Sequence, residues 1–191
     1  MEMAQRKFKI QNLKFKITMR IFCIFFIVVL FLLLPQISFA ESDYVLPYPS
    51  SMPGSFAYKS HIMYEKISKY WHFGNFGQFE YNLKMADKYL VEAKTLFDYK
   101  QYLLGYKALK KSDQYFINIL PNLMRAEKNG KNTLQKKVVF KEASQKHIEI
   151  LNKVEIETPD TFLWQPERSL PTTLNIKEAI LSAVFLREKS L

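Results

Sequence analysis

Residues 76–98 read FGQFEYNLKMADKYLVEAKTLFD, and this stretch decides the fold. Its apolar residues recur at alternating spacings of three and four, at Phe76, Phe79, Leu83, Ala86, Leu90, Ala93 and Phe97. At about 3.6 residues per turn, these positions form a single stripe along an α-helix. The spacing predicts a helix over 76–98 with one buried face, so other helices of the chain must cover it.

Helical patterns on both sides of this stretch supply those partners. The first predicted helix covers 56–71, and we expect its apolar side chains to face the core: Tyr58, Ile62, Met63, Ile67, Tyr70 and Trp71. A third helix follows a short connection near Tyr99 and ends at about Leu120, because Pro121 would stop it. It should form an antiparallel hairpin with the helix over 76–98.

Two more helices complete the predicted bundle. One covers about 134–154, and the last covers 176–189 behind a capping box formed by Asn175 and Glu178. Between them, 157–173 contains three prolines and is predicted to be a loop that packs back onto the bundle. The fold class is therefore all-α, an antiparallel helical bundle of about five helices behind an N-terminal signal peptide.

The N-terminal segment has the three parts of an export signal. Six of the 28 basic residues precede residue 21, and the apolar run from 21 to 34 would make a helix of roughly 21 Å, shorter than a bilayer core of about 30 Å. The small residues Ser38 and Ala40 then predict cleavage between Ala40 and Glu41. Alternatively, 21–40 stays uncleaved as an anchor that contacts the membrane.

This signal sets the predicted organisation and location. Residues 1–40 are the signal peptide, 41–55 are a proline-rich linker, and 56–191 are the helical bundle domain. The expected location is extracytoplasmic, secreted or at the cell surface, with a single N-terminal transmembrane helix as the alternative. The single cysteine, Cys23, lies within the apolar run, so the exported part has neither disulfides nor a cysteine nucleophile.

The charge of the exported part limits the classes of partner that it can bind. After residue 40 it has 22 Lys and Arg against 17 Asp and Glu, and 128–153 alone has seven lysines against two acids. One interpretation is a basic surface for anionic membrane or cell-wall polymer, formed by Lys136, Lys137, Lys141 and Lys146. The alternative is a solvated helix face, which is favoured because lysines are common on exposed helices. No nucleic acid partner is expected for an exported chain without a binding module.

At most two polar residues of the sequence are candidates for catalytic chemistry. Asp113 falls on the apolar stripe of the third helix, and His147 falls on that of the fourth. Asp113 either lies at the edge of its stripe or meets His147 across the bundle, because an unpaired buried charge is costly. The sequence has no metal-binding, cofactor-binding or nucleophile motif of the familiar kinds, so no metal, cofactor or catalytic residue is predicted.

Four stretches resemble a bacterial and archaeal family of exported proteins that is classed only as a domain of unknown function. They are Tyr44 to Pro49 (YVLPYP), Tyr70 to Phe73 (YWHF), Ala86 to Lys94 (ADKYLVEAK) and Lys146 to Leu151 (KHIEIL). The resemblance implies an exported, mostly helical domain and no known activity. Together with the residues, it favours a non-catalytic binding or structural component of the cell envelope whose partner is an unknown envelope protein or an anionic surface. The alternative is an extracytoplasmic enzyme that uses Asp113 and His147.

Overall fold

The computed structural model describes residues 19, 43–49 and 51–191. Residues from 43 onward belong to one compact unit, Glu41–Leu191. The predicted apolar run, the cleavage site at Ala40 and Glu41, and the alternative anchor lie outside the described residues. Among the helices that are described, none has both the length and the hydropathy to cross a membrane.

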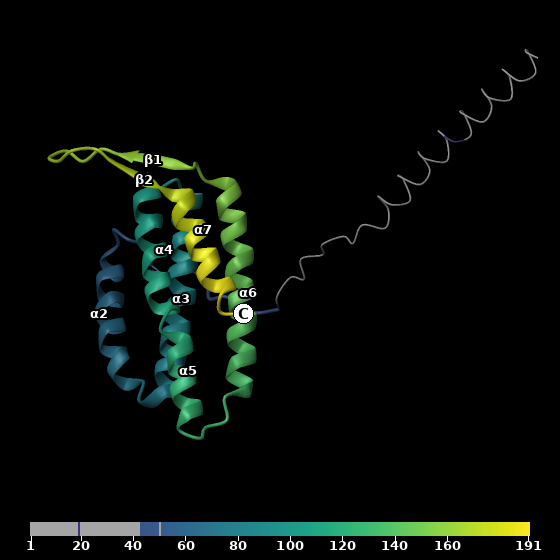
Figure 1. The fold of residues 1–191 in the computed structure, drawn as a ribbon. Coiled ribbons are helices and arrows are strands. Elements are labelled where there is room, and N and C mark those ends of the chain that lie inside the picture. Colours follow the sequence, from purple (N-terminus) through teal and green to yellow (C-terminus); the bar gives the residue numbers. More distant parts are fainter. Residues whose placement is uncertain (1–18, 20–42, 50) are drawn as a thin grey trace, which may run out of the picture. The chain divides into compact units, whose positions relative to one another are not determined.

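The described part is an antiparallel helical bundle, as the sequence predicts (Figure 1). Its elements end within a few residues of the predicted limits for most helices. In chain order they are α2 (Phe56–Trp71), α3 (Gly74–Asp98), α4 (Tyr102–Phe116), α5 (Ile119–Lys128), α6 (Leu134–Glu157), β1 (Thr161–Trp164), β2 (Thr172–Asn175) and α7 (Ile176–Glu188).

The predicted third helix is two helices, α4 and α5. The prediction that Pro121 ends a helix is wrong. Pro121 lies in the first turn of α5. That position tolerates proline because the backbone N–H of the first turn has no partner within the helix. The break comes earlier, at Ile117 and Asn118, where the backbone remains near the helical region.

The predicted loop over 157–173 contains a short antiparallel hairpin. β1 pairs with β2 in a register that places Phe162 opposite Leu174. The prolines lie just outside the two strands, where no ladder hydrogen bond is lost. The backbone carbonyl of Asp160, before β1, accepts hydrogen bonds from the N–H groups of Ile176 and Lys177, so it caps the start of α7.

The apolar stripe of α3 is the centre of the core. α3 contacts α4, α5 and α6, and α7 lies against α4 and α6. α4 packs closely on α3 at Gly105, where an added Cβ would meet the ring of Phe97 at 2.8 Å. The buried residues form two main apolar clusters. One includes Leu90, Phe97, Leu109, Leu151 and Ile180, and the other includes Phe79, Leu83, Phe116, Leu123 and Phe140.

The orientation of α2 differs from the prediction. Met63, Ile67, Tyr70 and Trp71 are exposed instead of facing the core, while the acid Glu65 is buried. The 3.6-residue period shows that an apolar stripe exists but does not show which way it points. α2 lies at the edge of the bundle farthest from α6 (Figure 1).

Candidate functional site

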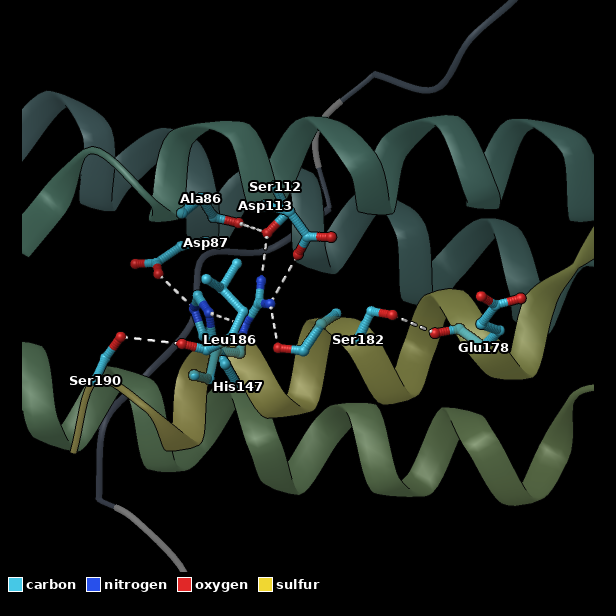
Figure 2. Close-up of polar contacts among 11 residues, drawn as sticks. Ala86, Asp87, Ser112, Asp113, His147, Glu178, Ser182, Leu186 and Ser190 are labelled. Atoms are coloured by element: carbon cyan, nitrogen blue, oxygen red, sulfur yellow. Dashed lines mark hydrogen bonds and ion pairs between the residues drawn. The ribbon is translucent and has the colours of Figure 1, made fainter.

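A layer of buried polar side chains separates the two apolar clusters. We call it the polar layer, and it consists of Asp87 from α3, Ser112 and Asp113 from α4, His147 from α6 and Arg187 from α7. Figure 2 shows Asp87, Ser112, Asp113 and His147 pointing toward one another. The layer therefore joins four helices by hydrogen bonds at one level of the bundle.

Arg187 is the hub of the polar layer. Its guanidinium donates through Nη1 to Asp113 Oδ1 at 2.8 Å, through Nη2 to Ser112 Oγ at 2.9 Å, and through Nε to His147 Nδ1 at 3.1 Å. Nη1 also donates to the backbone carbonyl of Ala183 at 2.8 Å, and the guanidinium carbon lies 4.7 Å from the centre of the Phe116 ring. The side chain is fully buried, and burial lowers the pKa of Arg187 while the Asp113 carboxylate opposes that shift. A guanidinium is suited to the centre of such a network because its planar array of N–H groups can donate to several acceptors at once.

These contacts determine the protonation of His147. An arginine N–H only donates, so Nδ1 of His147 must accept, and the ring proton is on Nε2. Nε2 then donates to Asp87 Oδ1 at 2.7 Å. The ring is therefore a neutral imidazole, in agreement with its pKa, which burial lowers most and the Arg187 charge lowers further.

Asp87 extends the network to the surface. Its second oxygen, Oδ2, accepts a hydrogen bond at 2.7 Å from the hydroxyl of Tyr44, in the extended segment 43–49. Burial, followed by the Asp87 charge, raises the pKa of Tyr44, so this hydroxyl stays protonated and donates. The segment that was predicted to be a linker thus has Tyr44 and Leu46 packed on the bundle.

Asp113 and His147, the two residues that the sequence singled out, are brought to the same layer. Asp113 is 9% exposed and His147 is 0% exposed. Each contacts Arg187, which lies between them and uses different nitrogens for each. Both nitrogens of His147 are engaged by side chains of the polar layer.

The sequence reasoning missed Asp87, Ser112 and Arg187. The signal that drew attention to Asp113 also applied to Arg187, which continues the spacing of Ile176, Ile180 and Val184 on the buried face of α7. A cation on one apolar stripe and a carboxylate on another are each other's natural partners. Asp87 gave no such signal because it falls beside the main stripe of α3.

A groove lies where the extended segment 43–49 crosses α3 and α6. It has a volume of about 740 Å³, within the range of about 300–1,000 Å³ that is usual for ligand sites. Apolar side chains form most of its walls: Val45, Leu46, Pro47, Phe79, Leu83 and Val139. Asp87 also lines it, as do Glu80, Lys84 and Lys136. The groove is therefore a mainly apolar surface that carries one buried carboxylate, Asp87.

The predicted basic surface is largely neutralised. Lys136 pairs with Glu80 at 2.6 Å, Lys137 pairs with Glu127 at 2.9 Å, and Lys146 pairs with Glu149 at 2.8 Å. Lys141 is exposed. These pairs lower the local positive potential, so the surface over α6 is less attractive to an anionic polymer than the lysine count suggests.

Comparisons with protein-family models, with curated proteins and with solved structures found no match to this chain. The resemblance to a family of unknown function stays a prediction. In the part of the chain that the structure describes, no three His, Cys, Asp or Glu side chains are grouped so as to hold a metal ion.

Proposed function

We propose that this chain is a non-catalytic, exported helical module that binds another protein of the cell envelope in the groove beside segment 43–49. The observation that carries the proposal is the groove itself: its walls are apolar, and its one buried carboxylate, Asp87, is held by Tyr44 and His147. A rigid apolar surface with few fixed polar groups is typical of a binding site.

The chemistry of the walls favours a protein segment as the ligand. Apolar side chains of a partner would be buried against Phe79, Leu83 and Val139, and each fully buried aliphatic or aromatic side chain contributes about 1.5–3 kcal/mol. At the rim, Glu80 and Lys136 neutralise one another, so the groove has no excess charge to select an anionic polymer.

The polar layer supports a structural rather than a catalytic role for Asp113 and His147. Both are buried, and Arg187 donates to one carboxylate oxygen of Asp113 and to Nδ1 of His147. If the chain is an enzyme instead, Asp113→Asn or His147→Gln should abolish hydrolysis of an envelope substrate while the protein stays folded. Reproducible turnover with that behaviour would overturn the proposal.

The binding test uses two neighbouring valines. Val139 lines the groove and Val138 is exposed beside it on α6, so Val139→Trp should fill the groove while Val138→Trp is a matched control. Proteins of the envelope fraction that are captured by wild type and by Val138→Trp, but at least about tenfold less by Val139→Trp, would be ligands of the groove; such a factor is about 1.4 kcal/mol. Equal capture by both variants would reject the groove as the binding site.

Export rests on the sequence of the N-terminal segment. A mature chain that begins at Glu41 is the expected product, and N-terminal sequencing of the native protein measures this directly. Replacing Ala40 by a bulky residue should leave 21–40 attached as an anchor, with the helical domain still exported because the basic start stays in the cytoplasm. A native protein that keeps residues 21–40 would make it a membrane-anchored module.

A further inference from the structure

Helix α2 is attached to the bundle by its polar side. Glu65 is buried and pairs with Lys88, and its other oxygen accepts a hydrogen bond from the Tyr89 hydroxyl at 2.7 Å. The Tyr58 hydroxyl donates to Glu92 Oε1 at 2.8 Å, and Tyr81 donates to the backbone carbonyl of Glu65. The inward stripe of α2 is therefore a row of polar contacts, which leaves its apolar side chains pointing away from the bundle.

The outward stripe of α2 is an apolar and aromatic surface. At about 100° per residue, its members share an arc of roughly 120°. They are Phe56, Met63, Tyr64, Ile67, Tyr70 and Trp71, and exposure ranges from 43% for Ile67 to 88% for Phe56. A single exposed apolar residue needs no explanation, whereas a contiguous stripe of this kind marks an interaction surface.

The charges of α2 are all of one sign on its exposed surface. Lys59, Lys66 and Lys69 lie along one flank of the apolar stripe and are exposed. The helix has one acid, Glu65, which is buried against α3. An apolar stripe with Trp and Tyr, bordered by lysines and free of exposed acids, has the chemistry of a helix that lies in the interface of an anionic bilayer.

We propose that the outer face of α2 docks on the surface of an anionic phospholipid bilayer. The aromatic side chains enter the headgroup region to a depth of about 5–10 Å, and the lysines contact the lipid phosphates. Tyr and Trp suit this position because each has an apolar ring with a polar group that stays hydrated. The proposal does not depend on the groove beside segment 43–49, which involves α3 and α6.

A second copy of the chain fits this face less well. A symmetric contact through α2 would place two sets of like-charged lysines beside one another, with no exposed acid on the helix to offset them. A bilayer supplies the missing negative charge and accepts a convex helix without a complementary groove.

The two tryptophans of the chain provide the test. The full chain is reconstituted into vesicles of phosphatidylglycerol and phosphatidylcholine, and Trp164→Phe leaves Trp71 as the only tryptophan. Trp71 fluorescence should be quenched by lipids brominated in their acyl chains and protected from acrylamide in the water. With Trp71→Phe, the remaining Trp164 of β1 should show the reverse pattern.

Charge variants measure the contribution of the lysines. Replacing Lys59, Lys66 and Lys69 together by glutamine should lower the ratio of docked to undocked helix on the order of 100-fold, because each lysine near an anionic surface contributes about fivefold. Glutamine at the exposed Lys107, Lys128 and Lys177 makes the same change in net charge on α4, α5 and α7, and should leave Trp71 quenching unchanged.

Each other outcome of the quenching test contradicts the proposal. Trp71 that is quenched by acrylamide and not by bromolipid lies in water, so the face does not dock. Trp71 that is protected from both quenchers is covered by protein, which would indicate a second copy or another protein on α2. Equal quenching in vesicles with and without phosphatidylglycerol would remove the role of the lysines.

Discussion

The bundle buries carboxylates in two regions, and these regions differ in how well the acids are satisfied. In the polar layer, Asp113 has a guanidinium partner, and Asp87 accepts hydrogen bonds on both oxygens. Between α2 and α3, both oxygens of Glu65 have partners, but Glu92 has one oxygen bonded to Tyr58 while its Oε2 is buried with no hydrogen-bond partner among the described residues. A buried polar atom without a partner costs about 1–3 kcal/mol.

This difference indicates which part of the molecule is held firmly. The polar layer fixes four helices to one another, while α2 is held to α3 by polar contacts and exposes its apolar stripe. Local stability follows the number of buried, satisfied contacts, so α2 should open more readily than α3, α4, α6 and α7.

The largest effect is expected from Arg187→Met. The change removes the cation and leaves Asp113 buried without its partner, which should lower the free energy of unfolding by about 3–5 kcal/mol. Urea denaturation measures this, with Arg125→Met on the exposed surface of α5 as a control that should change stability by less than about 0.5 kcal/mol. Combining Arg187→Met with Asp113→Leu should recover part of the lost unfolding free energy. If Arg187→Met alone lowers the free energy of unfolding by less than about 1 kcal/mol, the polar layer is not formed as described.

The pH dependence of stability tests the neutral state of His147. Its pKa is lowered in the folded protein, so between that value and 6.5 the unfolded chain binds a proton that the folded chain does not. The free energy of unfolding should therefore fall as the pH drops below about 6.5, by up to about 1.4 kcal/mol per pH unit. His147→Gln should reduce this slope in urea titrations at pH 7.5 and 5.5, since the other histidines are common to both proteins. An unchanged slope would show that the ring is not buried in its neutral form.

An intermediate, local effect is expected from Glu65→Ala. The change removes the partner of Lys88 and of the Tyr89 hydroxyl. The free energy of opening α2 should therefore fall by about 1–3 kcal/mol. Hydrogen exchange should accelerate in α2 and stay unchanged in the buried turns of α3. Lys66→Ala, on the exposed side of the same helix, is the control. Equal acceleration in α3 would mean that α2 and the polar layer form one cooperative unit.

The smallest effect is expected from Glu92→Gln. Burial raises the pKa of Glu92, so the folded protein loses stability as the pH rises from about 4.5 through that raised value. Glutamine has no charge to bury and keeps an oxygen for the Tyr58 hydroxyl, so at pH 7 the free energy of unfolding should rise, by at most about 1 kcal/mol. Thermal denaturation at pH 5 and pH 8 measures the difference; a clear loss of stability at pH 8 would show that the Glu92 charge is favourable where it lies.

The sequence predicted most helices because their stripes are long and regular. The pattern over 76–98 appears as α3, and its members from Phe79 to Phe97 are buried. Periodicity failed in two places for different reasons. Pro121 was interpreted as a stop, although a proline is as compatible with the first turn of a helix as with its end. The hairpin of β1 and β2 was missed because four-residue strands between prolines have little pattern to detect.

The candidate site was only partly visible because its members are far apart in the chain. Asp113 stood out as a charge on an apolar stripe, but its partner Arg187 is 74 residues away, and Asp87 and His147 are 60 residues apart. One sequence contains no information on which distant helices touch. The orientation of α2 could not be predicted for the same reason, because the polar partners of Glu65 lie on another helix, α3.

The order in which the helices are synthesised gives the polar layer a consequence for folding. Asp113 emerges long before Arg187, so a chain that stops short of α7 lacks the cation for this carboxylate, whereas the partners of Asp87, Tyr44 and His147, are already present. Burying Asp113 in such a partial bundle would cost about 3–5 kcal/mol, as breaking a buried ion pair does. The central contacts also have high sequence separation, which slows closure. We therefore expect the polar layer to form only after α7 has joined the bundle.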